Sequence, residues 1–275
     1  MRRNFISAFV AGMAVAFALG GCQHKMTAVP TSFDSVVVDK NERLVPGDTL
    51  SPACTLHVNL KYATPEDSVT RLINESIVRM ALDKEGADDY AMLEPQVAVD
   101  SFVTSYIRDY RTELTPYYKE ELQKGNVGSW YNYQYELNTS IVPSKDGVWG
   151  YQLELITYEG GAHGSHTITY MNFDKATGRQ LTLDDVFAPG YVEPLAQVLL
   201  VALQDKLQMK SLDELHDNGF LTWTDMYPTP NFLLGPDGVR FYYNAYEIAP
   251  YACGPTELVV SYEALKDLLK QEANQ

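Results

Sequence analysis

The sequence predicts an α+β fold, in which a largely antiparallel sheet packs against several helices in two closely associated modules. Two helical patterns come early in the chain, and short alternating strands separated by turns follow them. Strand and helix alternate little, which argues against a parallel α/β sheet. A composition of 45% hydrophobic and 21% charged residues is typical of a globular chain and not of a disordered one.

Residues 1–21 are expected to be a lipoprotein signal peptide and are set aside before the fold is considered. Arg2 and Arg3 precede an apolar stretch that ends in the bacterial lipobox pattern Leu19-Gly20-Gly21-Cys22. The alternative is an uncleaved membrane anchor, but a span needs about 20 apolar residues and this stretch is shorter. We therefore predict that Cys22 is acylated and inserts its lipid into a membrane.

Residues 22–52 are rich in Pro, Ser and Thr and are predicted to form a tether, with one short strand at 35–39. Gln23 follows Cys22 where the common inner-membrane retention signal has Asp. We therefore expect an outer-membrane lipoprotein that faces the periplasm. The folded body is predicted to comprise an N-terminal module at 53–145 and a C-terminal domain at 146–275.

The N-terminal module is expected to open with a strand and to continue with two helices. Residues 54–62 alternate between apolar and polar side chains, as in a half-buried strand. The pair Thr64-Pro65 is expected to cap and open a helix that Gly86 ends. A longer helix is predicted from Pro95 to Lys124, and Pro116 is expected to kink or split it.

After Gly125 the chain becomes rich in strand patterns. Residues 130–142 alternate and place Tyr131, Tyr133 and Tyr135 in one row, which either faces a ligand or packs under a helix, the commoner arrangement. The remaining expected elements are a hairpin turn at 145–147, strands at 149–155 and 166–173, a helix at 191–207, a capping box at 211–214, a hairpin turn at 235–238, a strand at 256–260 and a terminal helix capped by Ser261.

Four ordered motifs stand in the C-terminal half: Gly160-Gly161-Ala162-His163-Gly164, Tyr170-x-Asn172-Phe173-Asp174, Thr177-Gly178-x-x-Leu181-Thr182-Leu183-x-Asp185-Val186-Phe187, and Phe241-Tyr242-x-Asn244-x-Tyr246-Glu247-Ile248-Ala249-Pro250-Tyr251-Ala252-x-Gly254. Together they resemble the RsiV-like C-terminal domain family. Residues 58–154 resemble the module that accompanies this domain and that also precedes the deacetylase domain of PdaC-type envelope proteins. In RsiV-type anti-sigma factors this region binds lysozyme, so the resemblance implies a binding role with lysozyme as a candidate partner.

One candidate metal site is the set Glu159, His163 and His166. Two histidines three residues apart in a Gly-rich loop can approach one metal ion, and a carboxylate can complete the set. The alternative is that residues 160–164 form a tight connection in which His163 bonds to the backbone. The metal interpretation would make the protein a metal-dependent hydrolase acting on cell-wall glycan.

A candidate ligand-binding set is Asn244, Tyr246, Glu247 and Tyr251, which offers aromatic faces and a carboxylate to a sugar or a protein. The alternative is that these side chains lock their loop onto the sheet. Cys54 and Cys253 are a candidate disulfide, because the predicted lipid occupies Cys22 and only one pairing remains. Two buried free thiols are the alternative to that disulfide.

The formal net charge of −15 argues against nucleic acid as a partner, because phosphate binding needs clustered Lys and Arg. It favours a cationic partner instead. No P-loop, dinucleotide fingerprint or Gly-x-Ser-x-Gly elbow is present, and we expect no cofactor. The function predicted is a lipid-anchored binding or sensing module of the cell envelope, with the metal-dependent hydrolase as its competitor.

Overall fold

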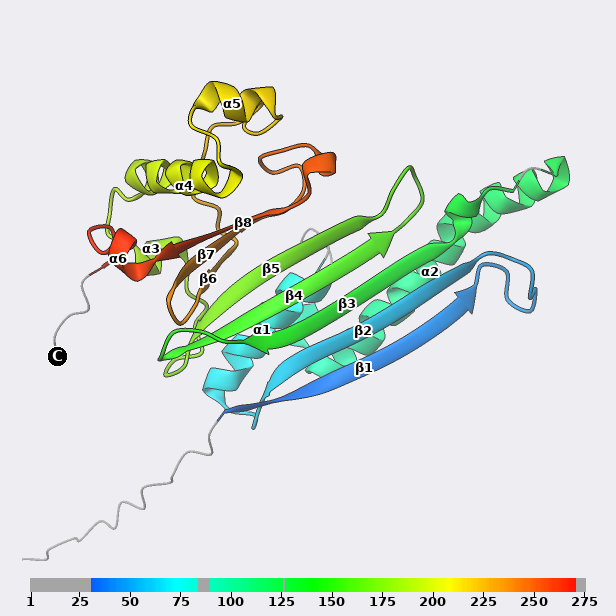
Figure 1. Ribbon diagram of the computed structural model, residues 1–275. Coiled ribbons are helices and arrows are strands. Elements are labelled where there is room, and N and C mark those ends of the chain that lie inside the picture. Colours follow the sequence, from blue (N-terminus) through cyan, green and yellow to red (C-terminus); the bar gives the residue numbers. More distant parts are fainter. Residues whose placement is uncertain (1–30, 84–89, 126, 271–275) are drawn as a thin grey trace, which may run out of the picture. The chain divides into compact units, whose positions relative to one another are not determined.

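The first layer of the structure is a five-stranded sheet covered by two helices (Figure 1). The computed structural model describes residues 31–83, 90–125 and 127–270. The strand order is β1-β2-β3-β4-β5, and every neighbouring pair is antiparallel except β2 and β3, which run parallel. The elements are β1 (Ser32–Arg43), β2 (Ala53–Thr64), α1 (Ser68–Leu82), α2 (Pro95–Lys124), β3 (Tyr133–Val142), β4 (Val148–Tyr158) and β5 (Ser165–Asp174).

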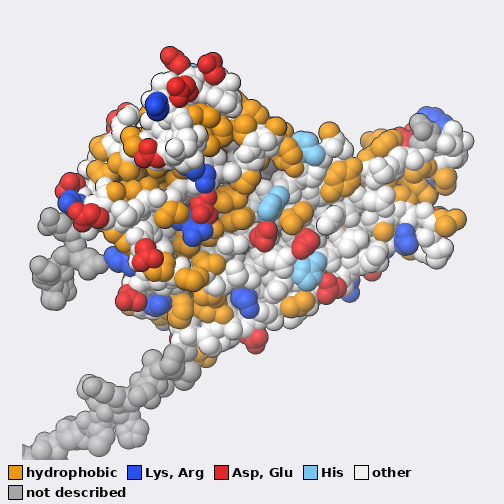
Figure 2. Space-filling view, viewed as in Figure 1, with side chains coloured by type: hydrophobic (Ala, Val, Ile, Leu, Met, Phe, Trp, Pro, Cys, Tyr) orange, Lys and Arg blue, Asp and Glu red, His pale blue; other side chains and the backbone are white. Residues whose placement is uncertain are grey.

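Both helices lie on the same face of this sheet (Figure 1). Side chains along each strand therefore alternate between the face that the helices cover and the face that they leave open. In β2 the side chains of Leu56, Val58 and Leu60 are buried in the core between sheet and helices. His57 and Asn59 point to the opposite face. Figure 2 shows histidine side chains beside acidic ones on the face that the helices leave uncovered.

The two helices connect the parallel strands β2 and β3, which a tight turn cannot join. Helix α1 begins later than the sequence indicated: its cap is Asp67, whose carboxylate accepts from the backbone N–H groups of Val69 and Thr70, and not Thr64. Thr70 completes a capping box with Asp67, an arrangement that outweighs the Thr-Pro signal. Helix α2 has the predicted bounds and runs through Pro116 without a break.

The predicted tyrosine row lies under α2 and not against solvent. Tyr131 packs edge-on against Tyr118, Tyr133 meets Tyr110, and Tyr135 lies 5.1 Å from Tyr106, measured between ring centroids. Most of these rings are buried in the first core. The row is therefore packing between helix and sheet, as the commoner alternative for such a row predicts.

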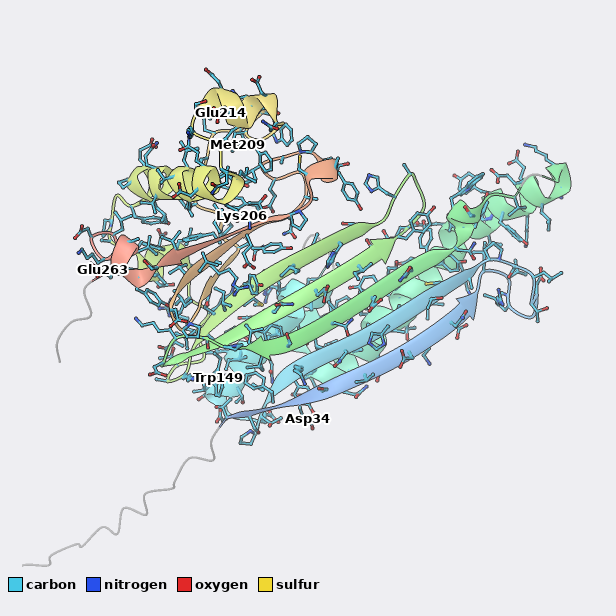
Figure 3. The ribbon with its side chains drawn as sticks, viewed as in Figure 1. Asp34, Trp149, Lys206, Met209, Glu214 and Glu263 are labelled. Carbon is cyan, nitrogen blue, oxygen red and sulfur yellow. The ribbon has the colours of Figure 1, made fainter. Side chains whose placement is uncertain are left out.

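The second layer is a three-stranded antiparallel sheet with four helices and a core of its own. The hairpin at 235–238 and the cap at Ser261 form as predicted, whereas only half of the predicted capping box at 211–214 forms: Ser211 accepts from the N–H of Glu214, but the Glu214 side chain does not return to the N–H of Ser211. Glu214, labelled in Figure 3, accepts from the backbone N–H of Lys210. The elements are α3 (Leu183–Val186), α4 (Val192–Leu207), α5 (Leu212–Asp217), β6 (Phe232–Leu234), β7 (Gly238–Tyr243), β8 (Thr256–Ser261) and α6 (Tyr262–Leu265).

Two asparagine side chains join β5 of the first sheet to the second layer. Asn172 donates to the carbonyl of Phe232 and accepts from the N–H of Leu234, both at 2.8 Å. Asn231 does the converse, donating to the carbonyl of Ile168 at 2.7 Å and accepting from the N–H of Tyr170 at 2.8 Å. Side-chain amides thus satisfy the edge of β5 where a further strand would otherwise bond.

The predicted boundaries differ from the structure in two places. Part of the expected tether is folded, because residues 32–43 form β1 and pair along the whole of β2. The ring of Phe33 meets that of Trp149 edge-on at 5.4 Å, at the end of the sheet where Figure 3 labels Asp34 and Trp149. The boundary at 145–146 falls inside the first sheet, because 145–147 is a hairpin turn between β3 and β4 and not a linker.

Candidate functional site

Two loops that are distant in the sequence meet beyond the end of β4. One is the β4–β5 connection with His163, and the other is the β7–β8 connection with Tyr246 and Tyr251. The imidazole of His163 stacks on Tyr251 with ring centroids 4.1 Å apart, and Tyr246 lies 6.4 Å from His163 and 5.6 Å from Tyr251. We call His163, Tyr246 and Tyr251 the ring cluster.

Two hydrogen bonds indicate which ring nitrogen of His163 carries the proton in the neutral imidazole. Nδ1 of His163 lies 2.9 Å from the carbonyl oxygen of Gly164, so this nitrogen carries a proton. Nε2 is then the acceptor in the neutral ring, and it lies 3.3 Å from the hydroxyl of Tyr246. Tyr251 donates to the same Gly164 carbonyl at 3.4 Å. The three rings are therefore bonded as well as stacked.

The loop that carries Tyr246 is held by its neighbours on both sides. Asn244 accepts from the N–H of Ile168 at 2.8 Å and donates to its carbonyl at 3.1 Å. Glu247 accepts from the N–H of Asn244 with one carboxylate oxygen, and burial raises the pKa of that carboxyl. The four predicted ligand-binding residues thus divide into two roles: Asn244 and Glu247 fix the loop, and Tyr246 and Tyr251 face outward.

Tyr246 has a backbone conformation that is uncommon for an aromatic residue. Residues 244–247 form a turn closed by a hydrogen bond from the N–H of Glu247 to the carbonyl of Asn244. Tyr246 is the third residue of this turn and has φ of 72°, where glycine or asparagine is usual. Its side chain is nevertheless 56% exposed, and that of Tyr251 is 41% exposed.

A shallow cavity of about 280 Å³ opens beside the ring cluster. Its other walls are backbone of the Gly-rich loop and polar side chains of β4 and β5, among them His166 and Thr167. His166 is bonded to Glu154 through Nε2 at 2.8 Å. The site therefore combines aromatic faces with donors and acceptors that remain open to solvent.

The structure does not assemble the predicted metal site. Glu159 accepts from the hydroxyl of Tyr106 at 2.6 Å, His163 bonds to the Gly164 carbonyl, and His166 pairs with Glu154. In the parts of the chain that the structure describes, no group of three or more His, Cys, Asp and Glu side chains is arranged to hold a metal ion. The β4–β5 connection turns each of the three side chains toward its own partner.

The predicted disulfide is not formed, and both cysteines are free. Cys54 is fully buried under α2 in the first core, where burial raises the pKa of its thiol to about 12. Cys253 is exposed in the β7–β8 connection, with its sulfur 3.9 Å from the carbonyl of Asn218. A buried strand residue and an exposed loop residue are therefore not paired. Cys22 lies outside the described residues.

Sequence reasoning separated His163 from the two tyrosines, although they form one site. It also missed Glu154, the partner of His166. The signal for Glu154 was its position on the polar face of β4, where it is paired diagonally across the antiparallel β4–β5 ladder with His166. No sequence signal of comparable strength joined residues 163 and 251.

A family model described as protein of unknown function (DUF3298) matches residues 184–263, which span the second layer from α3 to α6. A crystal structure of a DUF3298 family member from Bacteroides fragilis superposes with a TM-score of 0.81 and 32% sequence identity, covering 88% of this chain and 94% of that one. A DUF3298 family protein from Pseudomonas aeruginosa shares the fold with a TM-score of 0.60 and 18% identity, covering 88% of this chain and 95% of that one.

Curated relatives match a shorter part of this chain than the two crystal structures do. The immunogenic proteins MPB64 of Mycobacterium bovis and MPT64 of Mycobacterium tuberculosis are 28% identical over 143 residues, or 49% of this chain and 60% of theirs. The chain thus spans about 60% of the length of these relatives. No helix among the described residues is long and apolar enough to cross a membrane. With a 32% identical relative covered over 94% of its length, the chain belongs to the DUF3298 family.

Proposed function

We propose that the protein is a binding module of the cell envelope and that the ring cluster is its ligand-contacting surface. Tyrosine offers a large, rigid and amphipathic contact at low cost in conformational entropy. Tyr246 and Tyr251 offer such a contact on a loop that Asn244 and Glu247 hold in place. Preorganisation of this kind reduces the entropy lost when a ligand binds.

The observation that carries the proposal is the left-handed backbone of the exposed Tyr246, with φ of 72°. A non-glycine residue in this region costs of order 1 kcal/mol or more, and such strain persists most often where a function needs the side chain. Glycine or asparagine at 246 would relieve it. The ring of Tyr246 contacts His163 and Tyr251 and still keeps more than half of its surface open to a ligand.

The ligand that fits this surface is a sugar ring of a cell-wall glycan. A pyranose presents an apolar face to an aromatic ring and hydroxyl groups at its edge. The cavity beside the ring cluster offers both kinds of contact, with His166 and Thr167 as hydrogen-bonding groups. The predicted acylation of Cys22 and outer-membrane anchoring would present this surface to the periplasm, where such glycans lie.

Titration of the full chain with a soluble oligomer of N-acetylglucosamine, followed by calorimetry, tests the proposal. Removing one ring contact in Tyr246→Ala should weaken binding about five- to tenfold. Tyr117→Ala is the matched control, because Tyr117 is a 64% exposed tyrosine on α2 that does not line the cavity. Binding that is absent in the parent chain, or unchanged in Tyr246→Ala, would contradict the proposal.

A basic protein such as lysozyme is a second candidate ligand, favoured by the formal net charge of −15. A negative field speeds the encounter with a cationic partner and weakens as salt screens it. Titration with lysozyme at low and at physiological salt separates the outcomes. Binding that survives physiological salt and is lost in Tyr246→Ala would support recognition, and binding that vanishes with salt would show a nonspecific charge effect.

A further inference from the structure

A second cavity, of about 250 Å³, lies between α2 and the end of the first sheet where β3 begins and β4 ends. Four tyrosines and three carboxylates dominate its lining: Tyr90, Tyr106, Tyr110, Tyr133, Asp109, Glu113 and Glu159. Four of these seven come from one face of α2, because positions 106, 109, 110 and 113 recur at helical spacing. No Lys, Arg or His is among the residues that line it.

The floor of this cavity presents ring faces more than free hydroxyl groups. Tyr106 and Tyr110 are buried, and the ring of Tyr110 lies 5.1 Å from that of Tyr133. The hydroxyl of Tyr110 donates to the carbonyl of Tyr131 at 2.9 Å, and that of Tyr106 donates to Glu159 at 2.6 Å. With these two hydroxyls engaged and both residues largely buried, the half-buried ring of Tyr133 is the more accessible aromatic surface of the floor.

The rim of the cavity is acidic. Asp109, Glu113 and Glu159 are exposed, and the ion pair of Asp109 with Arg108 is open to solvent on both sides. Burial raises the pKa of the Tyr133 phenol, and the negative charges of Glu159 and Glu113 raise it further. The field that disfavours a phenolate at this position favours a bound cation.

We propose that this cavity binds a small organic cation through an ammonium group, which lies over the tyrosine rings and faces the carboxylates of the rim. The negative face of a tyrosine ring attracts a cation, and nearby carboxylates add to this attraction. The volume of about 250 Å³ accommodates a short alkylammonium. The described residues offer no group of three or more ligands for a bare metal ion.

The ammonium group can belong to a free amine or to a lysine side chain, since both present the same chemistry. This site is independent of the proposed glycan surface, because only Glu159 lines both cavities. Loss of the ring cluster should therefore leave amine binding intact, and the two proposals can fail separately.

Calorimetric titration of the full chain with butane-1,4-diamine tests the site, with neutral butane-1,4-diol as the matched probe of the same shape. We expect the diamine to bind and the diol to bind at least tenfold more weakly, which corresponds to a difference of about 1.4 kcal/mol in binding free energy. Lysine blocked at its amino and carboxyl ends, compared with butylamine, distinguishes the sources, because each carries one ammonium group: affinity equal to that of butylamine indicates a protein side chain, and weaker affinity a free amine.

The variant D109N/E113Q should weaken diamine binding about tenfold, because it removes two of the three rim charges without removing packing. Glu120→Gln is the control, since Glu120 is an equally exposed carboxylate of α2 that does not line the cavity. Circular dichroism of each variant checks its fold. The proposal is overturned if the diamine does not bind, if diol and diamine bind alike, or if Glu120→Gln weakens binding as much as D109N/E113Q.

Discussion

The imidazole of His163 lies face to face with the ring of Tyr251, with centroids 4.1 Å apart and planes inclined by 19°. His163 belongs to the connection between two strands of the first sheet, and Tyr251 to a connection in the second. The contact therefore adds a stacked pair to the asparagine bonds that already join the two layers. Both rings nevertheless keep solvent-exposed surface.

The stacked pair should show a measurable coupling in a double-mutant cycle. Because the rings are partly exposed, we expect His163→Ala and Tyr251→Ala to couple by about 0.5–1 kcal/mol in the free energy of unfolding. Urea unfolding of the parent, both single variants and the double variant gives this value. A coupling of zero would mean that the rings are only neighbours.

Tyr246→Asn should leave the fold as stable as before, or more stable by up to about 1 kcal/mol, because asparagine tolerates the left-handed backbone better than tyrosine. The same variant should lose binding of the glycan oligomer. Thermal unfolding and calorimetry together test this trade-off. A large loss of stability with binding retained would show that Tyr246 serves the fold and not a ligand.

Asn244→Ala should destabilise the protein by about 1–3 kcal/mol, because it leaves the N–H of Ile168 without its side-chain acceptor and removes one of the two side-chain donors to its carbonyl. Asn138→Ala is the matched control, since its amide bonds to side chains on the uncovered face of the first sheet, those of Glu136 and His57, and not to backbone groups of another layer. We expect the control to stay within about 0.5 kcal/mol of the parent. Equal effects of the two substitutions in urea unfolding would contradict the assigned role of Asn244.

The two cysteines of the folded part should differ sharply in reactivity. Cys253 is exposed, whereas burial raises the pKa of the Cys54 thiol to about 12, so almost no thiolate forms at neutral pH. A thiol reagent should modify Cys253 in the native protein and Cys54 only after unfolding. Mass mapping identifies the sites, and Cys253→Ser serves as the control. A native protein in which neither reacts, but both do after reduction, would restore the disulfide.

His57 should titrate above its ordinary range, because a hydrogen bond from its ring to Asp39 at 2.7 Å raises the pKa of the imidazole. Because the pKa of His57 is higher in the folded than in the unfolded protein, protonation of His57 stabilises the fold. This stabilisation is complete at pH values below the pKa of His57 in the unfolded chain. It is lost as the pH rises through the pKa of His57 in the folded protein. In Asp39→Asn the His57 pKa, followed by NMR, should fall. An unchanged value would assign the shift to another neighbour.

Local patterns predicted most elements, and contacts between distant residues explain most of the differences. The bounds of α2, the 235–238 hairpin and the caps at Ser211 and Ser261 follow from signals within a few residues. The N-cap of α1 was misassigned because two start signals, Thr64-Pro65 and the capping box of Asp67 with Thr70, lie within a few residues of each other. Only residues 35–39 of the long strand β1 were predicted as a strand, because the Pro- and Ser-containing segment around them has the composition of a tether until its partner β2 is known.

The candidate site illustrates the same limit. Each of its loops carries visible signals: glycines around His163, and tyrosines with Asn244 in the other loop. Their meeting depends on how the two sheets join, which the side chains of Asn172 and Asn231 determine. Periodicity within one segment contains no information on such a contact. The same limit applies to Cys54 and Cys253. They were paired by elimination, without information on the distance between them, and they are separate in the structure.

The single parallel pair in the first sheet has a consequence for how the protein assembles. β1–β2 and β3–β4–β5 are hairpins of sequence neighbours, whereas the seam between β2 and β3 joins positions such as Ala53 and Asn132, 79 residues apart. Closing so long a connection costs chain entropy before any seam bond repays it. We expect the amides of this seam to gain protection last in a pulse-labelled refolding experiment, after both hairpins, so that the sheet is completed from its two halves inward.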